Sequence, residues 1–169
     1  MATKTKKTNA SPAAASADVA GGSPGPAQLN LDIAAFHGVT TGQFSVATLS
    51  LTGTGGGLVT LNAGQIAVTG KVDFIISITS SVGLYIPVGI ALVQKSNPPG
   101  SGNPNDPQGY TNFANLSWKG TLLQFTNNWK QKGKRGTTAP VWKMYVLIAD
   151  LGAQPPTLGV IDPEISNED

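Results

Sequence analysis

The stretch Gln65-Ile-Ala-Val-Thr-Gly-Lys-Val-Asp-Phe-Ile-Ile-Ser-Ile-Thr79 alternates apolar and polar side chains over most of its length. A period of two is typical of a β-strand that buries one face. Glycine weakens the interior of a strand, so Gly70 marks a bend. The stretch therefore predicts one long, half-buried strand whose apolar face holds Ile66, Val68, Val72, Phe74, Ile76 and Ile78.

The segments on either side of this stretch show the same pattern. Upstream, Phe44 and Val46 alternate before the apolar phase slips to Leu49 and Leu51. One extra residue in a strand produces such a slip, so we expect a β-bulge near residues 47–48.

Downstream, residues 84–92 alternate again, and Pro87 on the opposite face favours an edge strand or a bulge. Residues 95–113 form one long loop rich in Pro, Gly and Asn. Residues 141–150 are apolar on both faces, which predicts a central strand, and residues 158–161 form a short closing segment. About eight strands without an amphipathic helix predict an all-β fold, a two-sheet antiparallel β-sandwich with the single jelly roll as leading topology.

Residues 1–28 differ in composition from the rest of the chain. They are rich in Ala, Ser, Gly and Pro, and after the first methionine no side chain is a larger hydrophobe than Val19. Such a segment cannot bury enough apolar surface to offset the entropy of ordering. We therefore expect a flexible N-terminal arm over residues 1–28 and a β-sandwich domain over residues 29–169. The arm opens with three lysines within four positions: Lys4, Lys6 and Lys7.

The whole chain carries few charges and no cysteine. Only 12% of its 169 residues are charged, against roughly 25% in typical soluble domains. The absence of cysteine excludes disulfides, zinc–thiolate sites and thiol nucleophiles. A surface built from hydroxyls and amides suits a protein packed against neighbours, and equally a neutral, soluble sandwich.

The charges are segregated along the chain. No acid lies between Asp106 and Asp150, where all six charges are cations: Lys119, Lys130, Lys132, Lys134, Arg135 and Lys143. No base follows Asp150, where all the charges are acids: Asp150, Asp162, Glu164, Glu168 and Asp169. This distribution allows electrostatic contacts between subunits, or between the two ends of one subunit.

Residues suited to catalysis or metal binding are scarce. His37 is the single histidine, and no Gly-x-Ser-x-Gly nucleophile motif occurs. Asp162 and Glu164 lie in a terminal segment, where contact with solvent or with a neighbour's lysines is the better interpretation than a catalytic pair. Residues 103–106 offer clustered oxygens with a single acid, which indicates a surface turn rather than a calcium site. We therefore expect a protein that is not an enzyme and has no metal or cofactor.

Two basic clusters are candidates for contacts with nucleic acid. The first is the lysine cluster of the arm, and the second follows Trp129: Lys130, Lys132, Lys134 and Arg135. Lysine–phosphate contacts release counterions and add affinity that does not depend on sequence, and an indole can stack on a base. A solvated terminus and a basic hairpin loop, with Trp118 and Trp142 in the core, are the alternatives.

The chain resembles small viral coat proteins built from a single jelly roll. The resemblance covers the whole length and rests on architecture: the basic arm, the linker to Pro26 and the β domain from Leu29. It implies a virion structural protein whose copies assemble into a shell, alone or with other capsid proteins. It also implies an arm that contacts neighbouring subunits and could reach the packaged genome. Genome-neutralising arms are richer in Arg and Lys. This arm therefore fits a tether between subunits, a light contact with nucleic acid, or a minor or phage-type capsid component.

The resemblance also implies localisation in the virion after synthesis in the host cytoplasm. In keeping with this, residues 8–28 contain no apolar core of a signal peptide. The most apolar stretch, residues 72–93, is interrupted by polar residues, glycine and proline, and predicts strands rather than a membrane span.

The alternative is a β-sandwich that binds carbohydrate or a receptor, including one that decorates a capsid. In that case Tyr110 and Trp129 would contact the sugar through their aromatic rings. The basic arm distinguishes the two hypotheses, because a lectin has no need of it.

Overall fold

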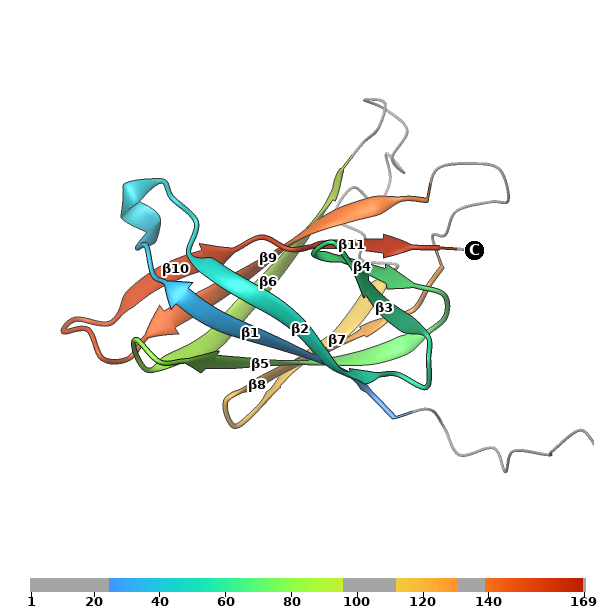
Figure 1. Cartoon of the computed structure of the whole chain (residues 1–169), viewed down its shortest axis with the longest axis horizontal. Coiled ribbons are helices and arrows are strands. Elements are labelled where there is room, and N and C mark those ends of the chain that lie inside the picture. Colours follow the sequence, from blue (N-terminus) through green and yellow to red (C-terminus); the bar gives the residue numbers. More distant parts are fainter. Residues whose placement is uncertain (1–24, 96–111, 131–138, 169) are drawn as a thin grey trace, which may run out of the picture.

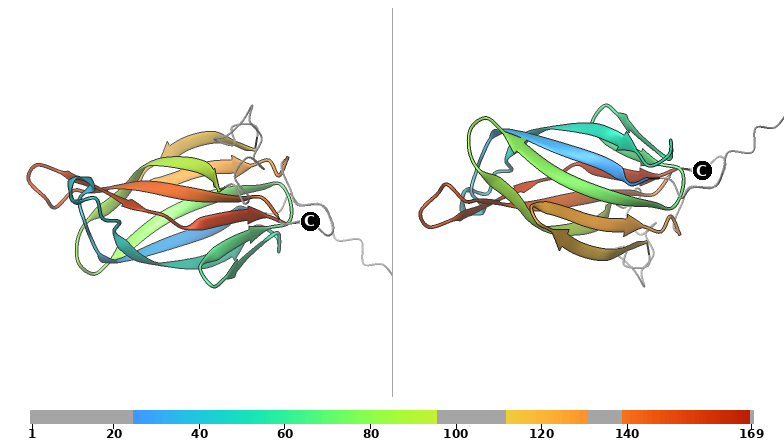
Figure 2. Two further views of the ribbon diagram at one scale, coloured as in Figure 1. Left: turned by 90° about the horizontal axis from the view of Figure 1, so that it is seen from above. Right: turned by 90° about the horizontal axis from the view of Figure 1, so that it is seen from below.

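The computed structural model describes residues 25–95, 112–130 and 139–168 (Figure 1). Within these residues the chain forms two β-sheets that pack face to face, and one short 3-10 helix, η1 (Val39–Thr41). Figure 2 shows the outer face of each sheet in turn, from above and from below.

The first sheet, called sheet A, has five strands in the order β2-β1-β5-β8-β7. Its strands are β1 (Ala27–Ala35), β2 (Val46–Thr54), β5 (Val72–Ser80), β7 (Phe113–Lys119) and β8 (Leu122–Asn127). β1 pairs antiparallel with β2 and parallel with β5, and the remaining pairs are antiparallel.

The second sheet, called sheet B, is organised around β9 (Val141–Asp150). One edge of β9 pairs along its whole length with β6 (Tyr85–Lys95). The other edge pairs first with β11 (Glu164–Asn167) and then with β10 (Thr157–Ile161). Beyond β11 the sheet continues through a parallel pairing with β4 (Gln65–Val68), which forms a hairpin with β3 (Val59–Asn62).

The core lies between the two sheets and confirms the all-β sandwich predicted from the sequence. Its largest fully buried side chains come from both layers: Trp142, Phe74, Leu29, Leu31, Ile33, Ile66, Ile76, Leu123, Met144, Ile148, Ile165 and Val59. Both sheets are mixed rather than wholly antiparallel. The chain between β1 and β5 passes through sheet B, so no hairpin forces these two neighbours to run in opposite directions. The connectivity differs in this respect from the antiparallel jelly roll expected from the sequence.

The stretch around Gly70 forms two strands instead of one bent strand. β4 and β5 belong to different sheets, and the chain crosses between the sheets at residues 69–71. A Cβ atom on Gly70 would lie 3.0 Å from Leu58 Cδ2, so the crossing packs tightly. The apolar alternation continues across the crossing because the inward faces of both sheets line the same core, and sequence periodicity alone cannot detect the change of sheet.

Two strand predictions are confirmed in detail. Residues 141–150 form the central strand β9, and residues 84–92 fall almost entirely in β6, which has a register shift between Pro87 and Gly89. Within the described residues β6 pairs with β9 alone, so it is an edge strand. Of the two tryptophans placed in the core, Trp142 is fully buried, whereas Trp118 is 50% exposed because it lies on the edge strand β7.

The two faces of β9 provide a stability test of this arrangement. Ile148 is fully buried in the core, whereas its neighbour Leu147 projects from the opposite face of the strand. We expect Ile148→Ala to lower the free energy of unfolding by about 2–5 kcal/mol and Leu147→Ala to lower it much less. Urea denaturation at low protein concentration measures both changes, and equal losses would contradict the assignment of the two faces.

Candidate functional site

The outer face of sheet A is a polar, hydrogen-bonded layer. Asn30 Nδ2 donates a hydrogen bond to Thr79 Oγ1 over 2.9 Å, and Thr79 Oγ1 donates to Asp32 Oδ1 over 3.1 Å. Ser77 Oγ donates to Asn30 Oδ1 over 3.1 Å. This layer matches the polar outside and apolar inside that a solvated antiparallel or mixed sheet ordinarily shows.

The outer face of sheet B is apolar instead over most of β6, β9 and β10, and Lys95, Lys143 and Glu164 share this face only where β9 begins. Met144, Val146 and Ile148 point into the core, so the residues between them, Tyr145 and Leu147, point outward. Directly paired residues on neighbouring strands share a face. The register therefore defines the apolar face of sheet B, whose members are Ile86, Ala91, Val93, Val141, Tyr145, Leu147, Ala149, Leu158 and Val160.

The loop at residues 36–45 adds an exposed aromatic ring to this face. Phe44 stacks on Tyr145 with the ring centroids 6.1 Å apart, and it remains 49% exposed. The backbone N–H of Ser45 donates to the carbonyl oxygen of Val160 over 2.8 Å, which joins the loop to β10. A Cβ atom on Gly159 would lie 2.6 Å from the Phe36 ring, so only glycine allows this close approach of loop and strand.

The same loop contains the single histidine. The Ser45 hydroxyl accepts a hydrogen bond from the His37 backbone N–H over 3.0 Å and donates one to the His37 carbonyl oxygen over 3.3 Å. Both contacts use the main chain of His37 and not its imidazole, so they close the loop and do not form a nucleophile–base pair.

The loop also contacts β6 through an aromatic pair. Phe36 stacks on Tyr85 with the ring centroids 5.1 Å apart. Burial raises the pKa of Tyr85 above its usual 10.0, and the Asp150 carboxylate raises it further.

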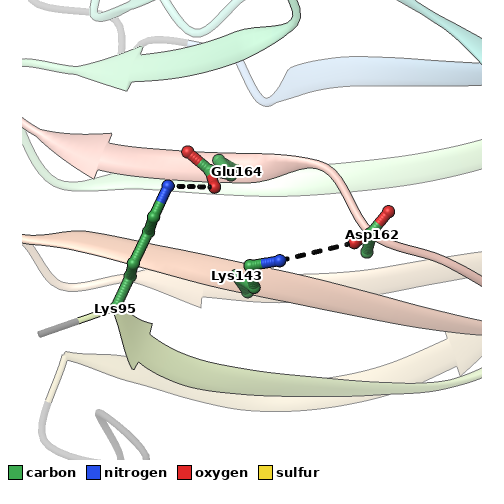
Figure 3. Close-up of polar contacts among 4 residues, drawn as sticks. All are labelled: Lys95, Lys143, Asp162 and Glu164. Atoms are coloured by element: carbon green, nitrogen blue, oxygen red, sulfur yellow. Dashed lines mark hydrogen bonds and ion pairs between the residues drawn. The ribbon is translucent and has the colours of Figure 1, made fainter.

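Two ion pairs cross the end of sheet B where β9 begins (Figure 3). Lys95 Nζ lies 2.8 Å from Glu164 Oε1, and Lys143 Nζ lies 3.6 Å from Asp162 Oδ2. The acids near the C-terminus thus pair with lysines of the same subunit, which is one of the two arrangements that the segregated charges allow. Exposed pairs of this kind contribute about 0–1 kcal/mol each to stability. Their larger effect is to balance charge at the border of the apolar face.

A second apolar feature, called the edge groove, lies between the edge strands β6 and β7. It is a cavity of about 320 Å³ whose apolar lining comes from the two edges and the core behind them: Ile90, Ala91, Leu92, Val93, Phe113, Ala114, Leu116 and Phe125. Val93 belongs to both the groove and the apolar face of sheet B, so the two surfaces are continuous around β6.

The side chains of Asn112, Asn127 and Asn167 form a buried amide cluster near the C-terminus of the chain, and this cluster holds Trp129 in place. Asn127 Nδ2 donates to Asn167 Oδ1 over 2.7 Å, and Asn167 Nδ2 donates to Asn112 Oδ1 over 3.0 Å. Asn127 Oδ1 accepts from the Trp129 backbone N–H over 2.9 Å. The Trp129 indole N–H donates to the Glu168 carbonyl oxygen over 2.9 Å, and its ring packs against the core. Trp129 is therefore half-buried, and both its indole N–H and its ring take part in the packing of the domain.

The structure brings together few of the residues singled out from the sequence. Lys130 is exposed beside the half-buried Trp129. The others lie outside the described residues: Lys4, Lys6, Lys7, Tyr110, Lys132, Lys134 and Arg135. Sequence reasoning missed the apolar face of sheet B, although a signal was present. Residues 141–150 are apolar on both faces, and burial at the centre of a sheet explains only the inward face.

No metal site or membrane helix is found in the part of the chain that the structure describes. There, no three residues among His, Cys, Asp and Glu cluster as metal ligands would. No helix in those ranges is long and apolar enough to cross a membrane. No protein-family model matches the chain, and no curated protein sequence matches it significantly.

The amide cluster leads to a testable expectation. Asn127→Ala removes one hydrogen bond from the Asn167 side chain and one from the Trp129 backbone N–H, so we expect a loss of about 1–3 kcal/mol in the free energy of unfolding. The matched control is Asn128→Ala, one position further along, where the side chain lies outside the cluster. 19F NMR of 5-fluorotryptophan-labelled protein separates the three indoles, and only the Trp129 signal should shift strongly in Asn127→Ala. An unchanged Trp129 signal would show that the cluster does not position this ring.

Proposed function

We propose that this protein is a structural subunit of a virion and assembles with copies of itself into a shell. The observation that carries the proposal is the apolar face of sheet B. A sheet that stays in water carries polar side chains on its outer face, as sheet A does. Contiguous apolar surface on a soluble protein marks a site of interaction with another molecule. Covering such a face contributes roughly 25 cal/mol for each Å² of apolar area buried.

The charges on sheet B favour another copy of this chain as the partner. Each copy presents two lysines and two acids at the border of the apolar face, paired within the subunit at Lys95–Glu164 and Lys143–Asp162. A surface that carries equal numbers of both signs does not repel its own copy, and symmetry then places the same patch on both subunits. The polar outer face of sheet A would remain in contact with solvent.

The arm and the exposed Lys130 complete the proposal. Lys4, Lys6 and Lys7 can contact neighbouring subunits and the phosphates of a packaged genome. Three charges add little affinity in one copy, but many copies on one shell act together. The role proposed here is structural and not catalytic.

Assembly is tested by a charge placed on the apolar face of sheet B. Leu158 is 40% exposed on this face, so Leu158→Asp should not disturb the core, whereas a desolvated carboxylate would weaken a contact between subunits. The matched control is Ser117→Asp on the exposed outer face of sheet A. Ultracentrifugation and electron microscopy over a concentration series should show particles for the wild type and for Ser117→Asp. For Leu158→Asp, the concentration needed for assembly should rise about tenfold, which corresponds to about 1.4 kcal/mol. A wild type that stays monomeric at every concentration and ionic strength would refute the proposal.

The contact with nucleic acid is tested separately. Replacing Lys4, Lys6 and Lys7 together by alanine should weaken binding to single-stranded nucleic acid equally for every sequence. It should also reduce the slope of log K against log salt by about 2, because each lost phosphate contact removes roughly 0.7. Titrations monitored by fluorescence anisotropy at several salt concentrations give the slope. An unchanged slope would exclude the arm from the contact.

A further inference from the structure

One end of the sandwich presents exposed apolar side chains that belong neither to the core nor to the apolar face of sheet B. Four of them form a group that we call the apolar tip: Val39, Val82, Leu84 and Leu151. Each of these residues is 40–63% exposed. They come from the three loops at residues 36–45, 81–84 and 151–156. Figure 1 and Figure 2 show these loops together at the end of the sandwich opposite the C-terminus.

The three loops meet around Tyr85, at the start of β6. Its ring stacks on Phe36 of the first loop. A Cβ atom on Gly83 would lie 2.6 Å from Tyr85 Cζ, so the second loop packs directly on the same ring. The third loop joins the second, because the Leu151 backbone N–H donates a hydrogen bond to the Leu84 carbonyl oxygen over 2.8 Å. The fold of a single subunit therefore holds the apolar tip in place without a partner.

The loops of the apolar tip carry no acidic residue, lysine or arginine, and His37 is their only titratable side chain. Behind them, burial and the Asp150 carboxylate keep the pKa of Tyr85 above 10.0, so its hydroxyl is uncharged at neutral pH. A charge that leaves water for an apolar environment is costly unless it is paired. The composition of the three loops avoids this cost.

Backbone donors of the tip are also bonded within the protein or absent. Ser80 Oγ accepts a hydrogen bond from the Val82 N–H over 3.1 Å, and Asp150 Oδ1 accepts one from the Gly152 N–H over 2.9 Å. Two further positions of the third loop have no N–H: Pro155 and Pro156. In hydrocarbon an N–H without a partner costs free energy, because no water is present to bond it. Loops built in this way suit contact with lipid.

The arrangement of the side chains favours a lipid surface over a second protein. They stand on the ends of three loops, so a protein partner would need a separate hollow for each loop. Lipid molecules rearrange around side chains of any shape, and binding then grows with the apolar area that enters the interface. Without cations, the tip gains nothing from the negative surface potential of anionic lipids. A bilayer with neutral headgroups is therefore the partner that fits.

We propose that the apolar tip inserts its four side chains into the surface of a lipid bilayer with neutral headgroups. Tyr85 then lies at the level of the headgroups, where its ring and its hydroxyl each find a suitable environment. This contact goes beyond the proposed shell and does not depend on it, because the apolar tip and the apolar face of sheet B share no residue.

Flotation of the full-length protein with vesicles of phosphatidylcholine alone tests the proposal. These vesicles carry no net charge, which removes any attraction of the basic arm. We expect Leu84→Asp to lower the partition coefficient about tenfold or more, because a charge replaces a side chain that would leave water. The matched control is Leu116→Asp, which changes a leucine of 43% exposure on β7, outside the tip. The control should bind as the wild type does, and salt should not change the binding.

A fluorescent label shows which part of the protein enters the lipid. The chain has no cysteine, so Val82→Cys provides a single site for a dye that is sensitive to its environment. The emission should shift to shorter wavelength when vesicles are added. The same dye at Ser117→Cys, on the exposed outer face of sheet A, should not shift.

Three results would overturn the lipid contact: a wild type that does not bind, equal binding of the wild type and Leu84→Asp, or binding without a shift at position 82. A change in assembly of Leu84→Asp without vesicles would assign the tip to a contact between copies, and would overturn the proposal as well. A wild type that stays monomeric and still binds vesicles through the tip would refute the shell and support the lipid contact.

Discussion

The packing of β9 is the interaction on which the rest of the structure depends. Its inward side chains, Trp142, Met144, Val146 and Ile148, are fully buried against sheet A. Its two edges join β6 on one side to β10 and β11 on the other. The hydrogen bonds of one strand thereby hold three others in register. The outward side chains of β9 then form the centre of the apolar face, so the strand that builds the core also defines the surface proposed for assembly.

The sequence predicts much of the fold because the longer strands alternate strongly between apolar and polar side chains. β9, the edge position of β6 and the sandwich itself follow from apolar periodicity and from Pro87. The split at Gly70 could not be predicted, because two strands that face one core keep the same alternation when they change sheets. β11 was missed because it has only four residues, and its Ser166 and Asn167 are buried polar groups that no hydrophobic pattern reveals.

The candidate site was harder to predict for a related reason. The residues singled out for binding were basic or aromatic, yet the feature that distinguishes sheet B from sheet A is the group of neighbouring apolar side chains on the outer face of β6, β9 and β10. That contrast depends on strand order and register, which place residues of β6, β9 and β10 side by side. Trp129 is a residue that the sequence did single out. An aromatic residue among lysines suggested stacking on a base or a sugar, but its indole N–H donates a hydrogen bond to the Glu168 carbonyl oxygen within the domain.

The amide cluster has a consequence for how this protein can change in evolution. Asn112 follows one of the internal segments outside the described residues, and Lys130 precedes the other. Asn112 Oδ1 accepts hydrogen bonds from the Lys130 backbone N–H and from Asn167 Nδ2, which joins both of these borders to β11. Buried groups of the sandwich thus hold the chain where the first segment ends and where the second begins. We therefore expect selection to keep these asparagines even where the sequence of residues 96–111 or 131–138 changes.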